Sequence, residues 1–272
     1  MRYVSAFRLI VLFFALAPFR EEQSVGQSRV PKTLFKDLPF EMNAFNATSF
    51  PKRSVSIEKY GAVGDGITDN TKAISEAISY ISGQGGGTVN IPEGLWFTGP
   101  IVFKSNVRLN LERGALLLFS NDKSRYPIVE TIFEGLTTRR CQSPISGRNL
   151  QNIAITGQGV IDGNGDAWRA VKKEKLTEAQ WKKLVASGGI VNSKNTEWYP
   201  SESFRRGMEL STDQNVPSIN SDLPGLEIKD FLRPVMVSFM NCRNVLLDGV
   251  TFQNSPAWCL HPLICENVII SM

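Results

Sequence analysis

An aromatic ring, an imidazole and a guanidinium fall within the last part of the sequence. Trp258 and His261 are three positions apart, and Arg233 precedes Pro234 upstream. An indole can stack on a sugar ring, an imidazole can donate to a hydroxyl or carboxylate, and a guanidinium can bind a carboxylate through two hydrogen bonds. These three residues are the candidates for substrate binding. The competing interpretations are a packed tryptophan, a satisfied core histidine and a surface arginine at a strand entry.

The aspartates that stand in glycine-rich segments have a structural interpretation. Asp65 and Asp69 form one such pair, and Asp162 and Asp166 form another. Glycine adopts backbone angles closed to other residues, and aspartate accepts hydrogen bonds from nearby amides in turns. We therefore expect turn-stabilising roles for these carboxylates, and we name no catalytic residue in this chain.

The four cysteines are too few and too scattered for a disulfide scaffold, and the sole histidine gives no zinc pattern. We expect neither a metal site nor a cofactor. Cys242 and Cys265 stand at matching positions before two similar segments, so they should stack in neighbouring coils. Stacked free thiols and a disulfide both fit that placement.

A repeated pattern of asparagine followed by alternating apolar residues organises the chain. The spacings between successive copies are 46, 92 and 23 residues, and the asparagines are Asn106, Asn152, Asn244 and Asn267. A period of about 20–50 residues indicates a solenoid of stacked coils. The spacing of 92 is expected to be partly coincidental, because a non-repeating insertion at about 167–232 lies inside it. Alternating apolar residues after a turn-forming asparagine are typical of short strands joined by tight turns, so the expected fold class is all-β.

Two helices are expected to interrupt the strands. The first helix follows Asp69 or Asn70 as its cap and ends at Gly83. One of its faces is apolar, so the helix suits a lid over the first coil. The residues of that face are Ile74, Ala77, Ile78 and Ile81. The second begins at the capping box Thr177–Gln180, carries Trp181 on its apolar side, and ends at Gly188–Gly189 within the insertion.

The charge is unevenly placed. The net charge is +4, and residues 169–206 alone carry nine cations against four anions. Such a local excess can steer an acidic polymer, although a solvated surface insertion is the competing interpretation. We expect no nucleic-acid partner, no stable membrane span and a monomer.

The N-terminus is typical of an exported protein. Residues 9–17 form a short apolar run after Arg2 and Arg8, too short to cross a bilayer. We expect residues 1–20 to be a signal peptide, 21–53 a linker or arm, and 54–272 the β-solenoid. Asn46 heads a glycosylation sequon.

Three segments carry a family resemblance. They are VSIEKYGAVGDGITDN at 55–70 continuing through GGGTVNIPEG at 85–94, ITGQGVIDGNGDAW at 155–168, and the stretch from Arg233-Pro234 to NSPAWCLHP at 254–262. Together they resemble the polygalacturonases of glycoside hydrolase family 28. The resemblance implies a single-stranded, right-handed, pectin lyase-like parallel β-helix. The basic insertion is similar to that of exo-acting bacterial members.

The resemblance implies inverting hydrolysis of galacturonan, an acidic plant polysaccharide, by a secreted or periplasmic protein. The family's catalytic motifs are an Asn-Thr-Asp or Asn-Gly-Asp tripeptide, an Asp-Asp pair, Gly-His-Gly and Arg-Ile-Lys, all downstream of the third segment. The sequence has no Asp-Asp, Gly-His-Gly or Arg-Ile-Lys, and Asn164-Gly165-Asp166 lies in the wrong segment. We therefore expect the N-terminal, truncated part of such an enzyme. The alternatives are a non-catalytic carbohydrate-binding or structural β-helix and, ranked lowest, a pectate lyase or epimerase.

Overall fold

The computed structural model of the chain describes residues 37–40, 48–210 and 227–271. The expected signal peptide, the glycosylation sequon at Asn46 and most of the expected N-terminal arm lie outside the described residues. Among the described residues, no helix is long and apolar enough to cross a membrane.

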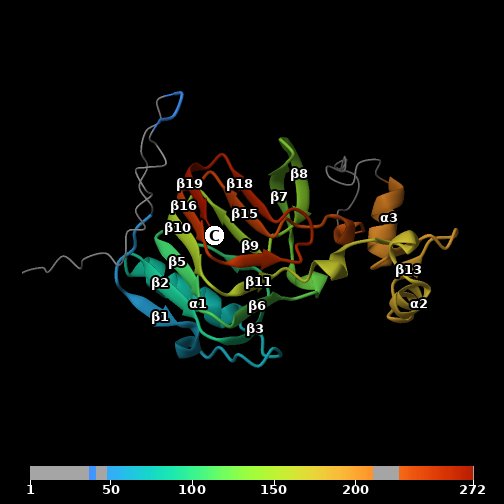
Figure 1. Ribbon diagram of the computed structural model, residues 1–272, viewed down its shortest axis with the longest axis horizontal. Coiled ribbons are helices and arrows are strands. Elements are labelled where there is room, and N and C mark those ends of the chain that lie inside the picture. The colour runs from blue at the N-terminus through green and yellow to red at the C-terminus, as the bar shows by residue number, and fades with distance from the viewer. Residues whose placement is uncertain (1–36, 41–47, 211–226, 272) are drawn as a thin grey trace, which may run out of the picture.

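Three parallel sheets form the body of the molecule (Figure 1). The first contains β1 (Ser54–Ser56), β2 (Gly87–Ile91), β5 (Val107–Leu111), β10 (Gln151–Gly157), β16 (Arg243–Asp248) and β19 (Glu266–Ser271). The second contains β3 (Gly94–Thr98), β6 (Ala115–Phe119), β11 (Val160–Asp162) and β17 (Thr251–Gln253). The third contains β4 (Ile101–Val102), β9 (Ile145–Arg148), β15 (Val237–Met240) and β18 (Leu260–Leu263).

The chain visits the three sheets in turn, so each circuit adds one strand to each sheet. This arrangement is the parallel β-helix expected from the sequence. The pairings Val107–Ile153, Ile153–Val245 and Val245–Val268 reproduce the spacings of 46, 92 and 23. The spacing of 92 is one coil with its insertion looped out between two strands, so its agreement with a multiple of 23 is coincidental, as expected.

Alternating side chains of the strands fill the interior. In β5, Val107, Leu109 and Leu111 are buried and the residues between them are partly exposed. Stacking places like residues in line, so Leu109 packs between Val89 and Ile155 of the neighbouring strands. Each such side chain contributes about 1.5–3 kcal/mol on burial, so the core is built from many similar steps.

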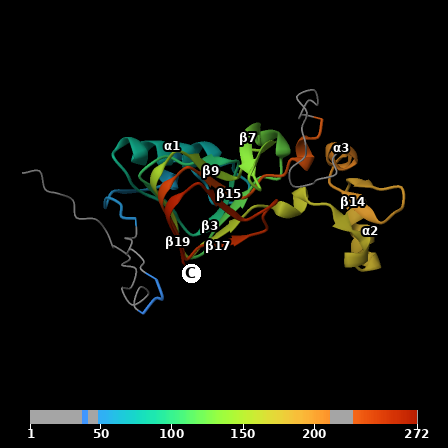
Figure 2. The same cartoon turned by 90° about the horizontal axis from the view of Figure 1, so that it is seen from above.

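Helix α1 (Thr71–Gly83) covers the first coil, as Figures 1 and 2 show. Its buried face carries Ala73 and the four residues expected from the sequence, which confirms the prediction of an amphipathic helix. The Asp69 carboxylate accepts hydrogen bonds from the Thr71 amide and hydroxyl. The Asn70 side chain instead bonds the backbone at Val63 and Phe97, so it joins the helix start to the coil beneath.

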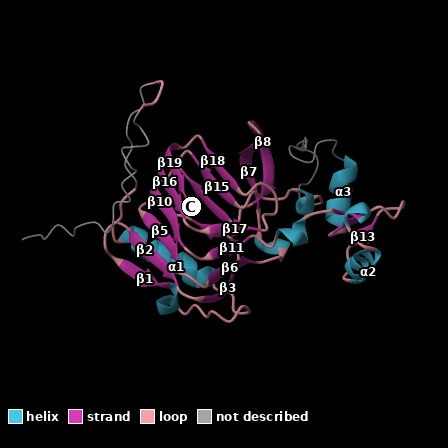
Figure 3. Cartoon of the chain, viewed as in Figure 1, coloured by secondary structure: helices cyan, strands magenta, loops and turns pink. Residues whose placement is uncertain are grey.

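Two excursions leave the coils. The antiparallel hairpin of β7 (Ile128–Phe133) and β8 (Leu136–Cys141) lies between β6 and β9 in the chain. The insertion lies between β11 and β15, and it carries α2 (Glu178–Ala186), α3 (Glu202–Leu210) and a small sheet of β12 (Val171–Lys172), β14 (Glu197–Tyr199) and β13 (Ile190–Val191). Figure 3 shows α2 and α3 together at one side of the β-helix. The capping box of Thr177 and Gln180 is present at α2, as predicted.

Candidate functional site

One corner of the β-helix collects the hairpin, the insertion and the segment 254–259. All three connect the second sheet to the third, in successive coils, so stacking places them one above another. Gly165 allows the closest approach, because a Cβ there would lie 2.3 Å from the Ser255 carbonyl oxygen. The Gly165 amide donates to the Asn254 carbonyl at 2.7 Å. Residues distant in sequence therefore meet at this corner.

Trp258 and His261 form an aromatic group with Phe133 of the hairpin. The ring centroids of Phe133 and Trp258 are 4.6 Å apart, and those of Trp258 and His261 are 5.8 Å apart. Phe133 is buried, His261 is 9% exposed, and Trp258 is 46% exposed. Trp258 thus rests on a buried ring while nearly half of its surface faces solvent, an arrangement that leaves ring surface for a ligand.

Arg140 of the hairpin joins this group to Arg233. Its guanidinium carbon lies 4.1 Å from the Phe133 ring centroid, and its Nε donates to the Arg233 carbonyl at 2.6 Å. Burial and the nearby Arg140 charge lower the pKa of His261 from its ordinary value. His261 is therefore neutral near pH 7, with one ring nitrogen that donates and one that accepts.

Arg233 lies in the segment that leads from the insertion into β15, and its side chain is half-buried. Its Nη1 donates to the Pro256 carbonyl at 3.1 Å, so it touches the segment that carries Trp258. Burial and the positive charge of Arg169 lower the pKa of Arg233 from its high ordinary value. Arg169 itself pairs with Asp166 and donates to Asn254 Oδ1 at 2.9 Å. Arg233 and Arg169 therefore both contact the segment 254–259 that carries Trp258.

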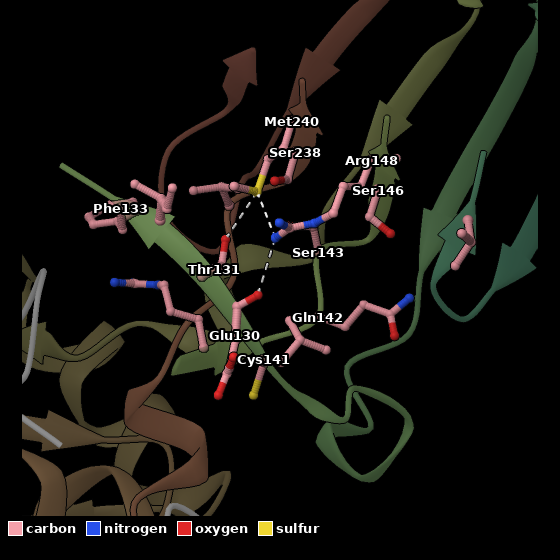
Figure 4. A pocket seen from close by; sticks show the side chains of 16 residues that line it. Glu130, Thr131, Phe133, Cys141, Gln142, Ser143, Ser146, Arg148, Ser238 and Met240 are labelled. Atoms are coloured by element: carbon pink, nitrogen blue, oxygen red, sulfur yellow. Dashed lines mark hydrogen bonds between the residues drawn. The ribbon is translucent and has the colours of Figure 1, made fainter. Parts of the chain in front are cut away.

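The outer face of the third sheet continues from His261 along the coils. Ser146, Ser238 and His261 occupy matching positions on β9, β15 and β18. A pocket of about 290 Å³ lies over Ser146 and Ser238, with the hairpin as its other wall (Figure 4). Within it the Arg148 guanidinium donates to Met240 Sδ at 3.3 Å, as the dashed lines show.

The carboxylates near the corner are occupied by structural contacts. Asp162 accepts hydrogen bonds from the Asn164 amide and from the side chains of Gln253 and Asn254. Asp166 pairs with Arg169. In the first glycine-rich segment, Asp65 accepts from the amides of residues 67 and 68. These contacts confirm the turn-stabilising roles predicted for the glycine-rich segments.

The potential metal ligands are dispersed, and the cysteines are unpaired, in the described part of the chain. No group of three or more potential ligands among histidine, cysteine, aspartate and glutamate occurs in the described part of the chain. All four cysteines are free thiols. Cys242 and Cys265 stand before paired strands, and their sulfurs donate to backbone carbonyls of Gly147 and Phe239 respectively. The stacked-thiol interpretation of the pair is therefore the correct one.

Two residues of this site were missed by sequence reasoning. Phe133 and Arg140 belong to the β7–β8 hairpin, which the sequence analysis did not predict. The available signal was the pair Glu134-Gly135 between two runs that contain β-branched residues, IVETIF and LTTRRC, and both turn residues have positive φ, as a type I′ hairpin turn requires.

Comparison with known proteins agrees with this architecture. Residues 54–110 match the family model described as Rhamnogalacturonase A/epimerase, pectate lyase-like. The chain is 36% identical over 232 residues to the Exo-poly-alpha-D-galacturonosidase of Dickeya chrysanthemi, a match that covers 82% of this chain and 36% of that protein.

Two solved structures are similar along most of the chain. One is a hyperthermoactive exopolygalacturonase from Thermotoga maritima, with a TM-score of 0.59, 34% identity, and coverage of 82% of this chain and 47% of that chain. The other is the family 28 exopolygalacturonase of Yersinia enterocolitica, with a TM-score of 0.57, 25% identity, and coverage of 84% and 39%. This chain spans less than half the length of each of these relatives. It has the pectin lyase-like parallel β-helix of the family 28 polygalacturonases, as its three motifs led us to expect.

Proposed function

We propose that the chain is the galacturonan-binding, N-terminal part of a polygalacturonase-type glycoside hydrolase. The observation that carries this proposal is the exposed ring of Trp258 beside neutral His261 and cationic Arg233. A sugar ring presents C–H groups that stack on an indole, while its hydroxyl and carboxylate groups need a hydrogen-bonding partner and a cation. These three side chains supply that combination within one corner.

We propose further that the chain supplies no catalytic carboxylate of its own. Inverting hydrolysis needs two carboxyl groups about 6.5–9.5 Å apart, one to protonate the leaving group and one to activate water. Asp162 and Asp166 are held by structural contacts, and Asp248 accepts a hydrogen bond from the Ser271 hydroxyl. Their occupation supports a division in which this part binds and positions the polymer.

A second candidate is a β-helix that binds carbohydrate without any chemistry. The same occupied carboxylates favour it, because a binding module needs the exposed ring and the cation but no acid–base pair. The two candidates share the Trp258 site and differ in whether hydrolysis ever occurs.

We also propose that the protein acts outside the cytoplasm, in keeping with its expected signal peptide and with a cell-wall polymer as ligand.

The proposed site is tested by calorimetric titration of the chain with trigalacturonate. Trp258→Ala should weaken binding about tenfold or more, which corresponds to about 1.4 kcal/mol. Tyr80→Ala is the matched control, since Tyr80 is an aromatic residue on α1 with the same 46% exposure, away from the corner. Equal affinities for the two variants would contradict the proposed site.

A further inference from the structure

A second concave region lies in the insertion, apart from the corner described above. It is a pocket of about 760 Å³ between β12, α2, β14 and α3, and we name it the insertion pocket. The volume lies within the range of sites that bind small molecules. Its walls come from four elements of the insertion, so the pocket exists because the insertion folds as a unit around it.

The walls of the insertion pocket have two kinds of side chain. One kind is apolar, with Val171, Leu176, Leu184, Trp198 and Met208. The other kind is cationic, with Arg169, Lys172, Lys175 and Lys183. An apolar surface with a basic rim suits a ligand that has C–H faces and negative charges on one framework.

The three lysines of the pocket form no ion pair in the part of the chain that the structure describes. They are Lys172, Lys175 and Lys183, and all three are exposed. Lys173, next in the chain, pairs with Glu178 at 3.4 Å and does not line the pocket. The three lysines therefore give the pocket a positive charge that is not paired within a salt-bridge network of the described residues.

Two acidic residues, Asp166 and Glu197, also line the pocket. Asp166 pairs with Arg169, and the Glu197 carboxylate accepts the Tyr199 hydroxyl at 2.8 Å. With these two counted, the four cations still leave a surplus of positive charge. An anion that enters the pocket therefore meets attraction from several sides.

The apolar wall is rigid where Trp198 forms it. The Trp198 indole donates to the Gly188 carbonyl at 2.7 Å, and a Cβ at Gly189 would lie 2.5 Å from its ring. Gly189 has a φ of +77°, so a glycine is required both for the backbone angle and for the close approach of the ring. The capping box at Thr177 fixes the start of α2, which carries Lys183 into the wall.

From these observations we infer that the insertion pocket is a second, non-catalytic site for an acidic saccharide. The carboxylates of the saccharide would bind the lysine ammonium groups, and the faces of its sugar rings would pack against the apolar wall. The choice of a uronate, as opposed to another carboxylated ligand, rests on the proposed function, whereas the anionic character rests on the pocket alone. Arg169 lines the pocket and contacts Asn254 of the corner, so the two sites are neighbours on one basic surface.

The test compares two triple variants of the full chain with equal loss of charge. Lys172→Gln, Lys175→Gln and Lys183→Gln remove the pocket lysines. Lys59→Gln, Lys182→Gln and Lys194→Gln are the matched control, since none of these lines the pocket, and Lys182 lies on the same helix. Calorimetric titration with trigalacturonate should resolve two binding sites per chain in both variants, one of them about tenfold weaker in the pocket variant than in the control. The methyl-esterified trisaccharide lacks the carboxylate charges, so its binding in the pocket should be equally weak in the two triple variants.

Hydrogen exchange measured by mass spectrometry locates the ligand. We expect protection of peptides from 169–187 that is reduced in the pocket variant at the same ligand concentration. Because exposed ion pairs are individually weak, the three substitutions together should weaken binding in the pocket about tenfold. Equal affinity and equal protection in the two triple variants would overturn the inference. Protection at 254–263 that Trp258→Ala abolishes reports on the proposed function separately, so either claim can fail alone.

Discussion

Asparagine side chains form a ladder along the first sheet. The amide of Asn152 donates to Asn106, that of Asn244 to Asn152 and that of Asn267 to Asn244, each at 2.8 Å. All four asparagines have a φ between 53° and 65°, which asparagine tolerates better than most residues. The residue type is thus set by two needs together, a left-handed backbone and a side chain that both donates and accepts.

Asn152→Ala should lower the free energy of unfolding by about 2–3 kcal/mol, because it removes two hydrogen bonds and strains a left-handed residue. Asn152→Gly removes the same bonds but accepts the backbone angle, so it should cost about 1–2 kcal/mol. Urea denaturation of both variants measures the difference. Equal losses would show that backbone strain contributes nothing at this position.

His261 is the sole histidine, so its proton resonances can be assigned without ambiguity. Because burial and Arg140 lower its pKa in the folded chain, a proton NMR titration should give a midpoint below the ordinary value near 6.5. The unfolded chain then binds the proton more readily than the folded chain. The stability that this group contributes is full above about pH 6.5 and is lost as pH falls through the lower, folded pKa.

The corresponding stability measurement uses His261→Gln. The loss of unfolding free energy on acidification from about pH 7.5 to 5.5 should be larger in the wild-type chain than in the variant. A midpoint at or above 6.5 in the NMR titration would contradict the burial of the imidazole beside Arg140.

At the scale of elements, the two predicted helices differ in what stabilises them. Helix α1 buries its apolar face on the first coil, whereas α2 buries only Trp181 and depends more on its cap. Helix α3 was not predicted. Its buried residues, Phe204 and Gly207, pack against the segment around Phe231, and that contact depends on tertiary structure that a local pattern does not reveal.

Thr177→Ala should destabilise α2 locally by about 1 kcal/mol through loss of the capping box. Amide hydrogen exchange in Glu178–Ala186 should become about fivefold faster, while the amides of the β-helix strands exchange as before. Thr177→Ser keeps the hydroxyl and is the control. Faster exchange throughout the strands would show that the insertion and the β-helix unfold as one unit.

The coils themselves depend on glycine at one close contact. Gly157 has a φ of +114°, and a Cβ there would lie 1.9 Å from the Leu111 carbonyl oxygen of the coil beneath. Gly157→Ala should therefore cost about 3 kcal/mol or more. Gly83→Ala, at the end of α1 with open space around it, should be neutral or slightly stabilising in the same denaturation experiment.

At the scale of the whole molecule, the coil stacking could be predicted from the sequence because strands pair in register. A parallel β-helix repeats its strand heads at nearly constant intervals, so Asn244 and Asn267 reveal one complete coil. The hairpin and the insertion lie outside the coils and have no such sequence repeat. The hairpin at 128–141 and helix α3 were missed for that reason.

The residues of the candidate site were predicted only in part. Trp258 and His261 are neighbours in sequence and stand in a recognisable segment. Phe133 and Arg140, which support them, lie more than a hundred residues earlier, and only the stacking of three connections at one corner brings them there. Local sequence patterns therefore predict the candidate residues Trp258 and His261 but not the hairpin residues that pack against them.

The most direct test of the account measures two quantities on the purified 272-residue chain with polygalacturonic acid: reducing ends released and polymer bound. The account predicts saturable binding, weakened by Trp258→Ala, with no reducing ends above the background of the untreated polymer. Release of reducing ends by the chain would contradict the claim that it supplies no catalytic carboxylate. Asp162, Asp166 and Asp248 would then be the candidates for catalysis.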